Sequence, residues 1–222
     1  MQQQPEYGSE LSRTSIRDFL AELSSAAPTP GGGAAAALTG AMSAALISMV
    51  CNLTVGRPRY AEVESAMQAT LGQSESARQR LLELAEEDAL AYRGVAAAYK
   101  LPRRNEEERS QRAAAIQQAL EQAAEPPLEV LTVSRALLSH CLAIAAHGNA
   151  NVVSDAGVAA ELCVAAVRSS ILNVRVNLSE AKNSAFIARC EAAIASAEAD
   201  LVDDYDRVIA IVRGKIARKA ER

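Results

Sequence analysis

The sequence contains no tryptophan and only 2 phenylalanines, although 50% of its 222 residues are hydrophobic. Alanine, leucine and valine therefore supply most of the apolar surface. This composition favours closely packed helices over a β-sandwich or barrel, which draw on aromatic and β-branched residues. No segment alternates convincingly between apolar and polar residues with the period of a strand. The sequence therefore predicts an all-α protein.

Cysteine and histidine are also scarce. No C-x-x-C pair occurs among the four cysteines, which we interpret as free, buried thiols in a reducing cytoplasm: Cys51, Cys141, Cys163 and Cys190. The two histidines, His140 and His147, have no second group of ligands at a recognisable spacing. We therefore expect no metal site. Neither a Ser/His/Asp nor a Cys/His triad can be argued from the sequence.

The sequence lacks the net positive charge typical of nucleic-acid-binding proteins and the N-terminal signal typical of secreted proteins. The formal net charge of −4 argues against a nucleic-acid partner. The segment Met1–Pro5 has neither the basic nor the apolar region of a secretory signal, which favours a cytoplasmic protein. No charged residue lies between Glu22 and Arg57, so the run could span a bilayer. Because it is rich in alanine, glycine and serine, we interpret it as a central helix buried on all sides and expect no membrane partner.

Apolar spacing predicts a single-domain bundle of about seven helices over residues 14–222, after a disordered tail at 1–13. Proline ends helices because it lacks an N–H, so Pro126-Pro127 is expected to separate two of them. The expected helices cover residues 15–27, 33–54, 61–99, 105–125, 128–146, 154–178 and 183–219. On the third of these, the expected core stripe is Leu81, Leu84/Ala85, Asp88, Tyr92, Val95 and Tyr99.

The stretch Pro28-Thr29-Pro30-Gly31-Gly32-Gly33 stands out because an alanine-rich helix follows it at once. Three glycines allow a close backbone approach, and a helix N-terminus leaves several N–H groups free for an anion or a polar planar group. The stretch is neither a nucleotide P-loop nor a G-x-G-x-x-G motif after a strand. Taken alone, we interpret it as a tight turn that leads into a close-packed helix, and only the other polar residues make it a candidate wall of a ligand site.

Three polar features interrupt the apolar pattern. Asp88 lies on the apolar stripe of its helix, where a carboxylate must be paired, hydrogen-bonded or functional. Asp155 lies in a loop rich in amides and acids, where Ser154 or Asp155 could simply cap the next helix. A polar edge on the sixth helix fits either an interhelical hydrogen-bond ladder or a ligand site: Ser170, Asn173 and Asn177.

Together these stretches resemble the cyclodeaminase/cyclohydrolase family of folate enzymes. The resemblance runs in order from about Ile16 to beyond Asn183, on Ala27–Gly33, Ser48–Gly56, Asp88, Leu101-Pro102, Gly148-Asn149, Val153–Ala159 and Asn173–Asn177. It is nearest to the stand-alone methenyltetrahydrofolate cyclohydrolases and implies a homodimer with a folate site near the glycine loop. Two departures are Ala34, where many members have Ser or Gly, and Arg57-Pro58-Arg59, which replaces a lysine-rich turn.

The resemblance implies hydrolysis of 5,10-methenyltetrahydrofolate to 10-formyltetrahydrofolate, with the folate as substrate and no separate cofactor. Asp88 and Asp155 are the candidates for general base and general acid, in an order that the sequence leaves open. The candidate substrate-binding residues are Thr29, Pro30, Gly31, Gly32, Gly33, Asn149, Ser154, Asn173, Asn177 and Arg104. Candidates for the glutamate tail, which could equally be solvated loop charges, are Arg57, Arg59, Lys100, Arg103 and Arg104. The alternatives are a formiminotetrahydrofolate cyclodeaminase that releases ammonia and a non-catalytic helical folate-binding or dimerisation module.

Overall fold

A computed structural model describes residues 13–220, except for the side chains of 219 and 220. Residues 13–220 contain no strand, which confirms the all-α prediction. The predicted disordered tail lies, apart from residue 13, outside the described residues. The helices are α1 (Ile16–Leu23), α2 (Gly32–Asn52), α3 (Glu64–Tyr99), α4 (Glu106–His147), α5 (Val153–Leu178), α6 (Ser184–Glu198) and α7 (Leu201–Ala220), with short 3₁₀ turns η2 (Pro58–Val63) and η3 (Ala150–Val152).

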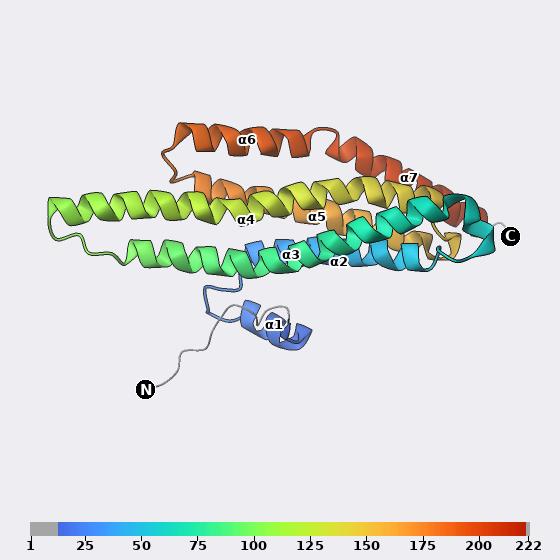
Figure 1. The fold of residues 1–222 in the computed structure, drawn as a ribbon, viewed down its shortest axis with the longest axis horizontal. Helices are drawn as coiled ribbons and strands as arrows, with labels where there is room; N and C mark the ends of the chain where they lie inside the picture. The colour runs from blue at the N-terminus through green and yellow to red at the C-terminus, as the bar shows by residue number, and fades with distance from the viewer. Residues whose placement is uncertain (1–12, 221–222) are drawn as a thin grey trace.

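Helices α2 to α5 form an up-down-up-down four-helix bundle in which each helix packs against its neighbours in the chain and α5 returns to α2. In Figure 1, α2 and α5 run behind α3 and α4, whereas α1 stands apart from the bundle. Helices α6 and α7 pack mainly on α4 and α5. Small side chains of α2, including the fully buried Ala34, Ala37 and Ala44, let the neighbouring helices approach closely.

The prediction that α2 is buried on all sides is wrong for one side. Met42 is 52% exposed and Ala45 is also exposed. The reason is the position of α2 at a corner of the bundle, where α3 and α5 flank it and α4 lies diagonally opposite. By length and composition alone, α2, α4 and the η3–α5 segment could each cross a membrane, and half or more of each apolar stretch is buried within the protein.

The predicted break at Pro126-Pro127 is also wrong, since both prolines lie inside the continuous helix α4. Without an N–H, Pro127 leaves the carbonyl of Ala123 without its usual helical donor. The Nδ2 group of Asn177 on α5 donates to that carbonyl at 3.1 Å. A side chain from the neighbouring helix therefore satisfies a group that the proline leaves free, and both prolines are buried in the bundle.

The single helix expected at 183–219 is instead divided into α6 and α7. Ala199 is extended and Asp200 has a φ of +54°, so the helix cannot continue through them. Arg135 of α4 donates to the carbonyls of Ala197 and Ala199 and forms an ion pair with Asp204 at 2.7 Å. These bonds satisfy carbonyls at the end of α6 and stabilise the break.

Helices of unequal length create a step at one end of the bundle. With 36 and 42 residues, α3 and α4 are much longer than α2 with 21 and α5 with 26. At a rise of about 1.5 Å per residue, α4 is longer than α2 by roughly 30 Å. The overhanging parts of α3 and α4 have a small core of their own, formed by Ala98, Ile116, Ala119 and Leu120. The step exposes the N-terminus of α2 between the overhanging helices.

Candidate active site

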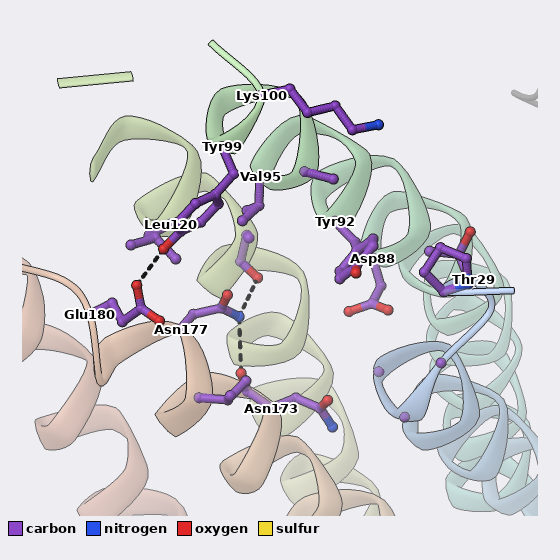
Figure 2. Close-up of a pocket in the computed structure, with 17 residues that line it drawn as sticks. Thr29, Asp88, Tyr92, Val95, Tyr99, Lys100, Leu120, Asn173, Asn177 and Glu180 are labelled. Atoms are coloured by element: carbon purple, nitrogen blue, oxygen red, sulfur yellow. Dashed lines mark hydrogen bonds between the residues drawn. The ribbon is translucent and has the colours of Figure 1, made fainter. Parts of the chain in front are cut away.

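A pocket of about 710 Å³ opens at this step (Figure 2). Gly31, Gly32 and Gly33 form one side of it, together with Pro28 and Thr29. The other walls come from α3 between Asp88 and Lys100, from α4 at Leu120 and Ala123, and from the end of α5 between Asn173 and Glu180. The glycine loop therefore meets the predicted acid Asp88 and the predicted amides Asn173 and Asn177 in one cavity.

Asp88 lies against the beginning of α2. The backbone N–H of Ala34 donates to its carboxylate, and a Cβ on Gly33 would lie 2.0 Å from its Oδ1 atom. Burial raises the pKa of Asp88, and the hydrogen bond from Ala34 partly opposes this rise. Only glycine at position 33 leaves room for the carboxylate, and the positive end of the α2 dipole faces it. The structure therefore shows Asp88 bonded to a helix N–H group rather than paired with an arginine, and its functional role stays a prediction.

The aromatic wall of the pocket was missed by the sequence prediction. Tyr92, Val95 and Tyr99 were expected in the core, but they line the pocket, and the two tyrosines are 46% and 40% exposed. The hydroxyl of Tyr99 donates to Glu180, which joins the end of α3 to the residues after α5 (Figure 2). This hydrogen bond is the main cause of the raised pKa of Tyr99. The sequence does contain a signal for this wall. Tyr92, Val95 and Tyr99 follow Asp88 by four, seven and eleven residues, and residues at these spacings lie on the same face of a helix.

The polar edge of α5 combines structural and pocket-facing roles. Asn177 donates from Nδ2 to the carbonyls of Ala123 and Asn173, so much of its hydrogen bonding holds helices together. Asn173 donates to Ser169 at 2.8 Å, and its Oδ1 atom would lie 3.4 Å from a Cβ on Gly32. Ser170 is fully buried and donates to Ala166, so it faces the core. Asn173 is therefore the amide placed beside the glycine loop.

Several predicted site residues lie outside this pocket within one chain. Pro30 is buried and does not line it, and Arg104 is exposed and pairs with Glu108 at 2.9 Å. Of the five cations expected near the glutamate tail, Lys100 lines the pocket, and the others do not. The predicted residues of the α4–α5 connection also lie elsewhere: Asn149, Ser154 and Asp155.

Asn149 has a structural role at the opposite end of the bundle. Its backbone N–H donates to Thr54 Oγ1 at 2.9 Å, and its Nδ2 group donates to the carbonyl of Leu53 at 2.8 Å. Its Oδ1 atom accepts a bond from the N–H of Asn151 and caps η3. Asn149 thus fastens the end of α2 to the start of α5, and Asp155 follows on the first turn of α5.

The same end holds a smaller cavity of about 400 Å³ with four basic side chains in its lining: Arg59, His147, Lys215 and Arg218. Burial and the neighbouring Arg218 lower the pKa of Lys215, whose Nζ group donates to the carbonyl of Ala146. We call this part of the protein the basic end and the part around Gly31–Gly33 and Glu180 the pocket end. No three His, Cys, Asp or Glu side chains are grouped for a metal ion in the described part of the chain. All four cysteines are free and buried, as predicted.

The fold and the pocket define a helical-bundle protein with a half-buried acid at a glycine-lined pocket. A family model described as formiminotransferase-cyclodeaminase matches residues 15–196. The chain belongs to this family, which confirms the resemblance inferred from its motifs.

Named relatives and a solved structure agree with this assignment. The methenyltetrahydrofolate cyclohydrolase of Methylorubrum extorquens AM1 is 47% identical over 77% of this chain and 82% of that protein. The formimidoyltransferase-cyclodeaminase of Mus musculus is 32% identical over 98% of this chain, which spans only 40% of the mouse protein. The crystal structure of formiminotetrahydrofolate cyclodeaminase from Thermotoga maritima superposes with a TM-score of 0.83 at 34% identity, over 93% of this chain and 100% of that chain.

Proposed function

We propose that this protein is a methenyltetrahydrofolate cyclohydrolase, which hydrolyses 5,10-methenyltetrahydrofolate to 10-formyltetrahydrofolate. The observation that carries the proposal is the half-buried Asp88 at the glycine-lined end of a pocket with tyrosines along one wall. The 47% identity to the named cyclohydrolase of M. extorquens supports this activity over others of the family.

The reacting carbon of the substrate lies between two nitrogens and shares their positive charge. An ionised Asp88 attracts this cation and accepts a proton from the water that attacks the carbon. The raised pKa of Asp88 makes its carboxylate a stronger base than an exposed aspartate, because base strength follows pKa. The hydroxyl of the adduct then loses its proton to water as the bond from carbon to the ring nitrogen breaks, that nitrogen receives a proton, and the formyl group stays on the other nitrogen. Asp155, the candidate acid from the sequence, lies at the opposite end of the same chain, so a second copy of the chain would have to supply it to this pocket.

The pocket walls suit the remaining parts of a folate. Tyr92 and Tyr99 offer aromatic surface for the flat rings, and Asn173 and the N-terminal N–H groups of α2 offer polar partners for the pterin edge. Lys100 at the rim is placed to meet a carboxylate of the glutamate tail. Hydrolysis requires only water and proton transfer, so the protein works without a metal or another cofactor. It acts in the cytoplasm as a homodimer, without a membrane or nucleic-acid partner.

A second candidate is the cyclodeaminase reaction, which the T. maritima structure of that name favours. There the folate nitrogen attacks a formimino carbon and ammonia leaves with a proton, so the same acid and base would serve. A non-catalytic folate-binding or dimerisation module is the third alternative.

Paired assays distinguish these functions. The cyclohydrolase removes the methenyl chromophore faster than the spontaneous reaction, and Asp88→Asn abolishes the excess rate. The cyclodeaminase releases ammonia from formiminotetrahydrofolate. A protein that binds folate but does neither is a binding module, and full activity in Asp88→Asn would contradict the role of Asp88. An unchanged rate after treatment with a chelator is expected, because no step uses a metal.

A further inference from the structure

The cavity at the basic end lies at the other end of the bundle from the candidate active site. Its volume of about 400 Å³ is within the range of about 300–1,000 Å³ that is usual for small-molecule sites. In the described part of the chain, it shares no lining residue with the pocket at the glycine loop. Three segments form it: the turn η2, the connection from α4 to η3, and the last two turns of α7. The cavity is therefore a separate candidate site within one chain.

The charged side chains that line this cavity, among the residues the structure describes, are all basic: Arg59, His147, Lys215 and Arg218. No ion pair between described residues includes any of these four. Elsewhere in the bundle, arginines do contact carboxylates, as Arg80 contacts Glu87 and Glu129 at 2.6 Å. The positive charge of the cavity is therefore not balanced by contact with an acidic side chain of the described chain.

The uncompensated charge at the basic end is unfavourable for the protein without a ligand. Lys215 is partly buried, and burial together with the neighbouring Arg218 lowers the pKa of Lys215. Both causes disfavour the charged form of the lysine. An anion in the cavity would oppose both, because it would attract the two cations and replace part of the solvation that burial removes.

The donors of the cavity are held in place by the surrounding structure. The Nζ group of Lys215 donates to the carbonyl of Ala146 at 2.8 Å, which leaves two of its three N–H groups for a ligand. The guanidinium group of Arg59 lies over the ring of Tyr60, 5.8 Å from the ring centroid. The hydroxyl of Tyr60 in turn accepts a hydrogen bond from the N–H of Ala150 at 3.2 Å. Segments from η2, η3 and α7 therefore present positioned donors to one cavity.

The number and type of these cations favour a phosphate group as the ligand. A phosphate monoester carries about −1.5 to −2 charges on three acceptor oxygens at neutral pH, whereas a carboxylate carries one charge on two oxygens. A guanidinium group can bind two phosphate oxygens at once, and an ammonium group adds a point charge. A cavity of this size holds a small molecule, and the net charge of −4 disfavours a nucleic acid.

Part of this cavity lies outside the region that the family model matches. The model ends at residue 196, whereas Lys215 and Arg218 lie on α7 beyond it. Two of the four basic side chains are therefore not explained by the matched family region. Their convergence with Arg59 and His147 is a feature of this chain.

We propose that the cavity at the basic end binds the phosphate group of a small molecule, with Arg59, Lys215 and Arg218 as the contacts of its oxygens. The bound phosphate joins η2 to the end of α7. A free phosphate ion and a phosphate ester are the two sources of such a group. The site does not depend on the proposed folate function, because no residue of the pocket end takes part in it.

Calorimetric titration of the full chain tests the proposal with two probes, inorganic phosphate and glycerol 3-phosphate, against sodium chloride at the same ionic strength. One phosphate group is expected to bind per chain and to raise the Tm, because a ligand of the folded state stabilises that state. Tighter binding of glycerol 3-phosphate identifies an ester as the source, and tighter binding of inorganic phosphate identifies the free ion. No saturable binding of either probe would overturn the proposal.

Matched variants locate the binding. Arg59→Gln and Arg218→Gln should each weaken phosphate binding about tenfold or more, because each removes a charge-assisted contact. Arg17→Gln is the control, since Arg17 is an exposed arginine on α1, which stands apart from the bundle. The rise in Tm with phosphate is measured against each variant's own Tm without phosphate, so a change in basal stability does not affect the comparison. Equal rises in all variants and the wild type would overturn the proposal.

Two competitors separate this site from a carboxylate site and from the folate pocket. Neither glutarate, a dicarboxylate, nor 5-formyltetrahydrofolate should displace phosphate at equal concentration. Displacement by either compound would overturn the proposal, because the cavity would then recognise carboxylates or belong to the folate site. Phosphate binding by a protein that is inactive on folates would contradict only the proposed function, and activity without phosphate binding would contradict only this proposal.

Discussion

The carboxylate of Asp88 occupies the space that a side chain at Gly33 would need. A Cβ there would lie 2.0 Å from Oδ1 and 2.3 Å from Cγ of Asp88. The glycine is therefore required by the acid rather than by an unusual backbone conformation, because Gly33 has no positive φ. The two residues come from α2 and α3, and their fit fixes the position of the acid relative to the start of α2.

Gly33→Ala should displace Asp88 and abolish most activity, with a loss of about 1–3 kcal/mol in the free energy of unfolding because the site is overpacked. Gly32→Ala is the control for stability alone, because its Cβ would make an ordinary contact of 3.4 Å with Asn173 but would also lie in the pocket wall. Chemical denaturation and the chromophore assay measure both effects. In the double variant that combines Gly33→Ala with Asp88→Ala, the free energy of unfolding should recover while activity stays lost. If it did not recover, the clash with Asp88 would not be the cause of the stability loss in Gly33→Ala.

Asp88→Asn should be inactive yet at least as stable as the wild type at neutral pH. Burial raises the pKa of Asp88 in the folded protein, so the folded state holds its proton more tightly than the unfolded chain. Stability from this group is therefore present at low pH and falls as the pH rises through the interval between the two pKa values. The Tm of Asp88→Asn minus that of the wild type should increase from acid to neutral pH. A difference that shrinks over this range would contradict the assignment.

Asn177→Ala should destabilise the protein by about 1–2 kcal/mol, because the carbonyl of Ala123 loses its donor. In Pro127→Ala, the restored N–H of residue 127 can donate to that carbonyl. The cost of Asn177→Ala should then fall by about 1 kcal/mol in the double variant. Urea denaturation of all four proteins measures this coupling. Simple additivity would show that the amide does not compensate for the proline.

Tyr99→Phe and Glu180→Gln should raise KM several-fold while kcat changes little. Each removes or weakens the hydrogen bond that joins the end of α3 to the end of α5 at the pocket wall. Because both act on one bond, the double variant should resemble either single variant. A large loss of kcat in either variant would instead indicate direct participation in the reaction.

The four cysteines should not react with a thiol reagent in the native protein and should all react after denaturation. All are buried, and burial raises the pKa of Cys51 to about 11 and that of Cys163 to about 12. The reactive thiolate is therefore both inaccessible and rare at neutral pH. Rapid native labelling of any cysteine would contradict this packing.

The sequence allowed prediction of what depends on local pattern. The helical class, the burial of Leu81 and Leu84, and the meeting of Asp88 with the glycine loop followed from spacing and from the family motifs. A helix break was wrongly predicted at Pro126-Pro127, because the side chain that replaces the missing hydrogen bond, Asn177, lies 50 residues further along the chain. The break before α7 depends on Arg135 in the same way. Long-range side-chain bonds of this kind leave no mark in local periodicity.

The aromatic wall was missed for a different reason. Tyr92 and Tyr99 obey the same helical spacing as the core residues Leu81 and Leu84, so periodicity alone assigns them to the core. What separates the two groups is the length of the neighbouring helices, because α2 begins beside Asp88 and nothing from it covers the later turns of α3. Relative helix length is a property of the assembled bundle.

The overhang of α3 and α4 has a consequence for how the pocket can change over evolution. Its walls are supported by a small separate core of Ala98, Ile116, Ala119 and Leu120, while the main core lies along the four-helix bundle. Substitutions in the small core can widen or narrow the cavity without disturbing the packing that keeps the bundle folded. The small core therefore shapes the pocket, while the main core of the bundle stabilises the fold. Substitutions that change substrate preference are expected in the small core.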